Sequence, residues 1–166
     1  MSLEALARAQ ELLGQHITST HSHRGDDTIV VDATQVHLVL RTLRDDPTLF
    51  MNFLVDITAV DYLGKDFRFE VVYHLRSFKT GARLRVKAPL VDPEDGSNPI
   101  IDSACDLWAS ANWFEREIWD LYGIKFTNHP DLRRILMYEE FVGHPLRKDY
   151  PKEKRQPLVR RPPDEV

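Results

Sequence analysis

The sequence predicts an α+β fold in which helices pack on a small mixed or antiparallel sheet, followed by an extended proline-rich C-terminal arm. Apolar residues recur at helical and strand spacings in the order helix, strand, helix, three strands, helix. The 166 residues, 42% of them hydrophobic, suffice for one domain with a single core. The last 23 residues instead concentrate prolines and basic side chains, which build no core.

The first part of the chain supplies two helices and a strand. Leucines and alanines at helical spacing predict an amphipathic helix over residues 2–15, and the polar stretch 14–25 predicts a linker. The β-branched run 28–32 predicts a strand. A helix is expected over 34–45, and Pro47 ends it.

The middle of the chain predicts a meander of three antiparallel strands. These strands are expected over residues 53–63, 67–75 and 82–88. The first pair closes at a turn formed by Gly64, Lys65 and Asp66. In the first strand, alternation places four residues on one face: Phe53, Val55, Ile57 and Ala59.

A third helix follows a loop. Residues 91–99 are rich in proline, glycine and acidic residues, which indicates a loop. Asp102 or Ser103 is expected to cap a helix that continues, with a break, to Tyr122 and ends at Gly123.

These elements predict a single α+β domain over residues 1–143 and an extended arm over 144–166. The arm holds five prolines and seven Lys or Arg against four Asp or Glu, so its charge is +3, whereas the preceding residues carry −7. Composition alone leaves open whether it is a disordered tail or an arm that lies on a partner.

Composition excludes several functions. A net charge of −4 gives no basis for nucleic-acid binding. One cysteine, Cys105, cannot form an internal disulfide or hold an iron–sulfur cluster with this chain's own thiolates. No apolar stretch approaches the ~18 residues of a membrane-spanning helix, and the N-terminus does not resemble a signal peptide. We therefore expect membrane contact only through partners, and a solvated loop around His21 and His23.

Charged residues are threaded through a dense aromatic segment. All three tryptophans lie between Trp108 and Trp119, and the acids and base among them are Glu115, Arg116, Glu117 and Asp120. Three interpretations compete: a catalytic carboxylate cluster, a solvated charged face, and a buried charge network. The density of rings favours the network, because buried charges are tolerated only when they are paired.

Two histidines each precede a proline. Proline biases its predecessor towards extended conformations, so His129 and His144 are expected in loops or turns. Capping a turn or pairing with an acid is the favoured role for both, with metal ligation or proton handling as the alternative. Arg133 and Arg134 are expected to pair with the acids of the dense segment or to reach a partner.

A family signature runs through the same residues. It is matched by Glu115, Arg116, Glu117, Asp120, Leu121, Tyr122, His129, Arg133, Ile135 and Leu136. Residues 143–151 match its continuation. The sequence therefore resembles the 30-kilodalton subunit family of the proton-pumping NADH–quinone oxidoreductase, respiratory complex I. The resemblance is specific over residues 102–151. Before residue 102 it extends only to the architecture.

The resemblance implies a structural, non-catalytic subunit of the peripheral arm of that complex. Electrons would pass from NADH through FMN and iron–sulfur clusters to quinone, all of them bound by other subunits, and this chain would bind no cofactor. Its partners would be chiefly the quinone-site (49 kDa) subunit and neighbouring iron–sulfur subunits, on the cytoplasmic face of a bacterial inner membrane or the matrix or stromal face in an organelle.

Residues of the signature and its continuation are then candidates for internal bracing or partner contact. They are Glu115, Arg116, Glu117, Asp120, Tyr122, His129, Arg133, Arg134, His144, Arg147, Lys148 and Asp149. Two alternatives stay open. One is the equivalent subunit of a ferredoxin- or deazaflavin-dependent complex or a membrane-bound hydrogenase. The other is a stand-alone hydrolase that uses Glu117, Asp120 and His129.

Overall fold

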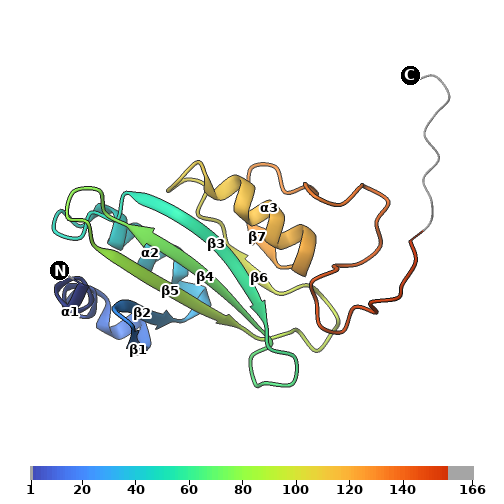
Figure 1. Cartoon of the computed structure of the whole chain (residues 1–166), viewed down its shortest axis with the longest axis horizontal. Helices are drawn as coiled ribbons and strands as arrows, with labels where there is room; N and C mark the ends of the chain where they lie inside the picture. Colours follow the sequence, from blue (N-terminus) through green and yellow to red (C-terminus); the bar gives the residue numbers. More distant parts are fainter. Residues whose placement is uncertain (1, 157–166) are drawn as a thin grey trace.

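A computed structural model describes residues 2–156 of the chain, with side chains from residue 4 onward, as a mixed five-stranded sheet packed against helices (Figure 1). The helices are α1 (Ser2–Leu13), α2 (Val36–Asp45) and α3 (Ala111–Tyr122), with short 3-10 turns η1 (Gly14–His16) and η2 (Ala33–Gln35). The strands are β1 (Ile17–His23), β2 (Asp26–Val31), β3 (Phe53–Asp61), β4 (Phe69–Arg76), β5 (Arg83–Leu90), β6 (Ile100–Asp102) and β7 (Lys125–Thr127). The α+β prediction is confirmed.

The large sheet has the strand order β1-β2-β5-β4-β3. Its only parallel pair is β2 with β5, so the sheet is mixed, and β3, β4 and β5 form the predicted antiparallel meander. A separate two-stranded parallel sheet joins β6 to β7. One hydrophobic core lies between the large sheet and the helices, and it includes Phe69, Tyr73 and Val86 of the central strands.

The predicted linker over 14–25 is wrong, because most of it forms the edge strand β1. β1 pairs antiparallel with β2, and His21 and His23 lie on this strand and not in a loop. Arg24 and Gly25 close the hairpin with φ of 53° and 85°, as a primed two-residue turn requires. The strand is mostly exposed, so it lacks the apolar alternation by which a strand is recognised.

The predicted inward face of β3 is also partly wrong. The pairing with β4 shifts register between Leu54 and Asp56, as it does at a β-bulge. Leu54, Ile57 and Ala59 are buried, whereas Phe53 and Val55 point to solvent. One extra residue in a strand reverses the alternation on one side of it, and no sequence pattern marks its position.

The helix expected to begin at Asp102 or Ser103 begins instead at Ala111. Residues 100–102 form β6, a turn follows in which the Trp108 N–H donates to the Ala104 carbonyl, and α3 starts after Ser110. Ser103 caps no helix; its hydroxyl donates to Glu115. The predicted end is confirmed, because Gly123 adopts φ +77° and its N–H closes the last turn.

The segment after β7 contains no helix or strand as far as residue 156. It lies beside α3 and the end of β3 through hydrogen bonds described below, and in Figure 1 it runs along the side of the molecule where α3 ends. Residues 157–166 lie outside the described residues, so the division at residue 143 and the extended arm stay predictions. No helix within residues 2–156 is long and apolar enough to cross a bilayer.

Candidate functional site

Asp120 is the centre of a polar brace between α3 and the segment that follows β7. Its side chain is fully buried, although the sequence around it is strongly charged. Asp120 Oδ2 accepts the backbone N–H groups of Ile135, Leu136 and Met137 at 3.0, 2.8 and 2.8 Å. Burial raises the pKa of this carboxyl, but the three N–H donors and Arg134 outweigh burial, so its pKa lies below the ordinary value.

Arg134 completes the brace. Its Nη1 lies 2.5 Å from Asp120 Oδ1, and its Nη2 donates to the carbonyls of Phe141 and Gly143 at 2.9 and 3.1 Å. The guanidinium also lies 5.6 Å from the Trp119 ring centre and 5.7 Å from that of Phe141. One planar cation therefore holds three parts of the chain together.

His144 is bound to the same helix. Its Nδ1 lies 2.9 Å from the Asp120 carbonyl, so this nitrogen carries the proton and donates. Its ring lies so close to Gly123 that a Cβ at that glycine would stand 2.6 Å from two ring atoms. Burial lowers the pKa of His144, so the ring is neutral at pH 7. The partner of His144 is thus a backbone carbonyl of α3 and not an acidic side chain, and its role stays a prediction.

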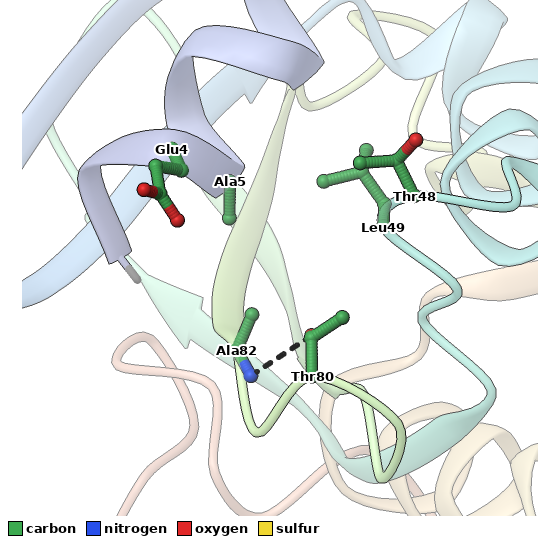
Figure 2. A pocket seen from close by; sticks show the side chains of 6 residues that line it. All are labelled: Glu4, Ala5, Thr48, Leu49, Thr80 and Ala82. Carbon is green, nitrogen blue, oxygen red and sulfur yellow. Dashed lines mark hydrogen bonds between the residues drawn. The ribbon is translucent and has the colours of Figure 1, made fainter.

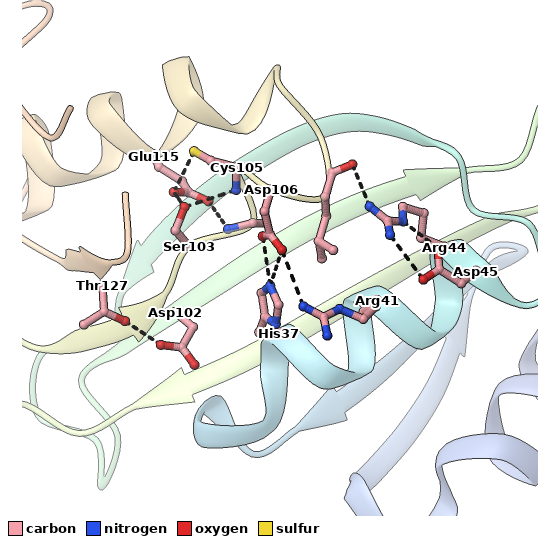
Figure 3. A network of polar contacts seen from close by, with 12 residues as sticks. His37, Arg41, Arg44, Asp45, Asp102, Ser103, Cys105, Asp106, Glu115 and Thr127 are labelled. Carbon is pink, nitrogen blue, oxygen red and sulfur yellow. Dashed lines mark hydrogen bonds and ion pairs between the residues drawn. The ribbon is translucent and has the colours of Figure 1, made fainter. Parts of the chain in front are cut away.

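Glu115 forms a second buried node, between α3 and residues 103–105 (Figure 3). Its Oε2 accepts the Ser103 hydroxyl at 2.6 Å and its Oε1 accepts the Ala104 N–H at 2.7 Å. The predicted charge network is only partly present here, because no basic side chain pairs with Glu115 in residues 4–156. Burial raises its pKa to about 6, against the hydrogen bonds from Ser103, Ala104 and the Cys105 thiol, which lower it.

Cys105, Glu115 and His129 place one ligand atom each within 4.8 Å of one another. The sequence offers no spacing that pairs a histidine with Cys105, and only folding brings them together. His129 is already engaged: its Nδ1 accepts the Asp131 N–H at 3.0 Å, so its Nε2 keeps the proton and faces the Asn112 carbonyl at 3.2 Å. Burial raises the pKa of Cys105 to about 11, which keeps the thiol protonated. A metal here would have to displace these bonds and both protons.

A third node fixes the end of the described segment to the sheet. Arg68 lies within 3.4 Å of Asp61, 2.6 Å of Asp92 and 2.7 Å of Asp149. Asp61, which is buried, also accepts the Lys148 backbone N–H at 2.8 Å. No sequence motif marks Arg68 or Asp61, since their partners are up to 87 residues away.

The remaining predicted residues have different surroundings. Arg116 donates to the carbonyls of Arg133 and Arg134 and not to an acid, and Arg133 pairs with Asp131 at the surface. Arg147 Nε donates to the Tyr122 carbonyl at 2.6 Å. Glu117 is exposed, and no hydrogen bond or ion pair of the described residues involves it. Of the expected arginine–acid pairings, only that of Arg134 with Asp120 is formed.

Helix α2 makes a further contact that sequence reasoning missed. His37 Nε2 lies 2.9 Å from the Asp106 carboxylate, and Arg41 lies 3.5 Å from it (Figure 3). Figure 3 also shows Arg44 with Asp45 on the same helix and Asp102 bonded to Thr127 across the small sheet. The contacts of His37 and Arg41 with Asp106, and the bond from Arg44 Nη1 to the Leu107 carbonyl at 3.2 Å, hold the turn after β6 against α2.

The three nodes leave little freedom for chemistry. Both oxygens of Asp120 and both oxygens of Glu115 are occupied, as are both nitrogens of His129. No hydrogen bond joins any two of Glu117, Asp120 and His129 in the part of the chain that the structure covers. The arrangement can hold loops against a helix. The Cys105 thiol donates to Glu115 Oε2 at 3.5 Å, but burial raises the pKa of this thiol to about 11, so it is not activated as a nucleophile at pH 7.

Comparison with known proteins supports the family resemblance of this region. A family described as "Respiratory-chain NADH dehydrogenase, 30 Kd subunit" matches residues 29–156. An NADH-quinone oxidoreductase C subunit from Citrifermentans bemidjiense is 50% identical over 147 residues, which cover 89% of this chain and 88% of that protein. The same subunit of Geobacter sulfurreducens is 46% identical over 148 residues, with the same shares covered.

Two solved structures are similar. A trypsin-resistant fragment of Nqo5 (residues 1–134) superposes with a TM-score of 0.64 at 32% identity, over 80% of this chain and all of the fragment. A chain of an archaeal membrane-bound sulfane sulfur reductase superposes with a TM-score of 0.74 at 24% identity, over 91% of this chain and 86% of that chain, which shows a shared fold. By the extent of these matches, the chain belongs to the family of the 30-kilodalton subunit of respiratory-chain NADH dehydrogenase, which includes these NADH-quinone oxidoreductase subunits.

Proposed function

We propose that this chain is a non-catalytic subunit of the peripheral arm of an NADH–quinone oxidoreductase, and that it positions neighbouring subunits through which electrons pass. The observation that carries the proposal is the state of the candidate catalytic groups. Asp120, Glu115 and His129 bind backbone groups and neighbouring side chains of their own chain, as structural residues do. The family supplies the setting, since its members are subunits of such a complex.

The segment after β7 supports a docking role. Four large apolar side chains on it are exposed although its backbone is held firmly from within: Leu136, Tyr138, Val142 and Leu146. Exposed apolar groups on irregular but braced backbone are typical of a surface that a partner covers. Basic side chains follow them in sequence, at Lys148, Lys152 and Lys154.

We propose the quinone-site subunit and the neighbouring iron–sulfur subunits as the partners on this surface. FMN, the iron–sulfur clusters and quinone then belong to other subunits of the complex. The location that follows is the cytoplasmic face of the bacterial inner membrane, or the matrix or stromal face in an organelle, with membrane contact only through the complex.

The first test is purification of the tagged chain, alone and from cells that assemble the complex. The complex should carry flavin and iron and oxidise NADH with a quinone acceptor, whereas the isolated chain should do neither. Stoichiometric flavin or iron in the isolated chain, or NADH oxidation by it, would contradict the proposal.

The second test removes residues 152–166. Deletion should lower the yield of assembled complex while the isolated chain keeps its thermal unfolding temperature, because the braced nodes all lie before residue 152. Glu117→Gln serves as a companion variant, since Glu117 is exposed and without a hydrogen bond in the described chain. An assembly defect in that variant supports the subunit role, and loss of a turnover activity by the lone chain supports a hydrolase.

A further inference from the structure

Four large apolar side chains are exposed in the loop before β3, at the start of β3 and in the β4–β5 turn. We call Phe50, Phe53, Val55 and Phe78 the aromatic patch. Phe78 is 64% exposed, Val55 46%, Phe53 40% and Phe50 39%. The rings of Phe53 and Phe78 lie 4.7 Å apart, so they form a continuous surface. Apolar clusters of this kind on a folded domain mark sites of interaction.

The backbone of Phe50 is strained in order to hold this position. Its φ is +45°, a left-handed conformation that bulky residues rarely adopt. The conformation is fixed from below by Asp46, whose carbonyl accepts the Phe50 N–H at 2.7 Å and whose carboxylate accepts the N–H groups of Thr48 and Leu49. Strain of this kind persists only where the surroundings enforce it, and it clusters at functional sites.

A second loop is tied to the first. The Phe78 N–H donates to Asn52 Oδ1 at 3.2 Å, and Lys79 Nζ donates to the Pro47 carbonyl at 3.1 Å. The two loops therefore present Phe50 and Phe78 as one preorganised surface, and less conformational entropy is lost when a partner binds.

A hollow lies against the two loops that carry Phe50 and Phe78 (Figure 2). The same two loops line it, and α1 supplies its far wall: its residues are Glu4, Ala5, Thr48, Leu49, Thr80 and Ala82. In Figure 2 the Ala5 and Leu49 side chains stand on opposite sides of the space above Ala82 and Thr80. Rings beside a partly apolar hollow suit a partner that has both a flat surface and a projecting side chain.

Cations flank the rings. Arg76 lies 5.9 Å from the Phe78 ring centre and Lys79 lies 5.8 Å from that of Phe50. A second copy of the chain placed face to face here would bring these like charges together, which disfavours self-association. A partner with carboxylates around an apolar centre would instead complement them.

We propose that the aromatic patch docks a further subunit of the complex, through an apolar segment flanked by acidic residues. This inference rests on the proposed function. β3 links the aromatic patch to the segment after β7, for which a docking role is proposed above. Phe53 begins the strand, and Asp61, which ends it, accepts the Lys148 N–H. The nine residues of β3 span roughly 27 Å. The chain thus contacts partners at both ends of one rigid strand.

The test places a photoreactive benzoylphenylalanine at position 78 of the tagged full-length chain, in cells that assemble the complex. Irradiation should join the chain to another subunit of the oxidoreductase, at an apolar residue with Asp or Glu nearby, as identified by mass spectrometry of the product. In the same background, Lys79→Glu and Phe53→Ser should each reduce the crosslinked yield by about tenfold or more. The matched control is Leu38→Ser, an exposed apolar residue on α2, which should leave the yield unchanged.

The possible outcomes separate the two proposals. If the tagged chain is recovered without oxidoreductase subunits, the proposed function fails and this inference falls with it. If the chain is in the complex but position 78 crosslinks to a second copy, to lipid or to nothing, the inference alone is overturned. Equal yields for Lys79→Glu and the Leu38→Ser control would also overturn it, because the flanking cation would then have no role.

Discussion

The guanidinium of Arg134 lies 2.5 Å from the carboxylate of Asp120, and that carboxylate also accepts the backbone N–H groups of residues 135–137. Both side chains are largely out of contact with water, so neither charge has a substitute partner. Asp120, a residue of the family signature, and Arg134, which lies inside the signature segment, therefore hold the irregular segment after β7 in its shape, and the exposed apolar groups of that segment depend on them.

Replacing Asp120 with Asn should lower the free energy of unfolding by about 3–5 kcal/mol, because it leaves the Arg134 cation buried without a counter-charge. Urea unfolding of the isolated chain measures this. Glu117→Gln, on the same helix but exposed and unbonded within the described chain, is the matched control and should change stability by less than about 0.5 kcal/mol. Equal effects of the two substitutions would contradict a brace centred on Asp120.

Gly123 is required for two separate reasons, and Gly81 isolates one of them. Both have positive φ, +77° and +74°, but a Cβ at Gly123 meets the His144 ring at 2.6 Å whereas a Cβ at Gly81 meets nothing within 4 Å. Gly81→Ala should lower the free energy of unfolding by about 1 kcal/mol through backbone strain. Gly123→Ala should lower it by about 1–3 kcal/mol more, since the ring must move. Thermal unfolding of both variants measures the difference. Similar losses of stability would mean that the His144 ring moves aside at little cost.

The local sequence pattern was enough to predict the meander, helices α1 and α2, and the end of α3. These depend on the periodicity of apolar residues and, for α3, on a glycine at the helix end. It missed β1 because an exposed edge strand of Thr, Ser and His has no apolar alternation. The inward face of β3 was predicted wrongly because the strand contains a bulge. The start of α3 was predicted too early because the Ser103 hydroxyl binds a glutamate twelve residues later and does not cap a helix.

The candidate site was predictable as a group of residues but not as a set of bonds. The signature residues are in one region, as expected, and Asp120 with Arg134 is one of the pairings that the sequence left open. The other expected pairings fail because backbone groups compete: Arg116 binds carbonyls, and Glu115 accepts a hydroxyl and an N–H. Contacts such as Asp61 with the Lys148 N–H join residues 87 apart, beyond any local rule.

Asp61 should control how firmly the end of the described chain is held. Asp61→Ala removes the acceptor of the Lys148 N–H and one of the three carboxylates around Arg68. Limited trypsin digestion after Arg147 and Lys148 should then speed up about tenfold or more, as expected when local opening becomes easier. Asp66→Ala, in the exposed β3–β4 turn, is the control and should leave the cleavage rate unchanged. An unchanged rate in Asp61→Ala would show that other contacts hold the segment.

The raised pKa of Glu115 should appear as a pH dependence of stability. Its pKa is about 6 in the folded chain, against an ordinary value of 4.5, so between these values the folded state holds a proton that the unfolded state has lost. Stability from this group is therefore fully present below about pH 4.5 and decreases as pH rises through 6, by about 2 kcal/mol.

Glu115→Gln removes the titrating group while His74, His129 and His144, whose lowered pKa values have the opposite effect on stability, stay the same. The unfolding free energy of the native chain minus that of the variant should decrease by about 2 kcal/mol between pH 4 and pH 7, as measured by urea unfolding at each pH. A flat or rising difference would mean that hydrogen bonds from Ser103 and Ala104 outweigh burial. A carbon-13 titration of the Glu115 carboxyl in the native chain gives the same pKa directly, should the variant fail to fold.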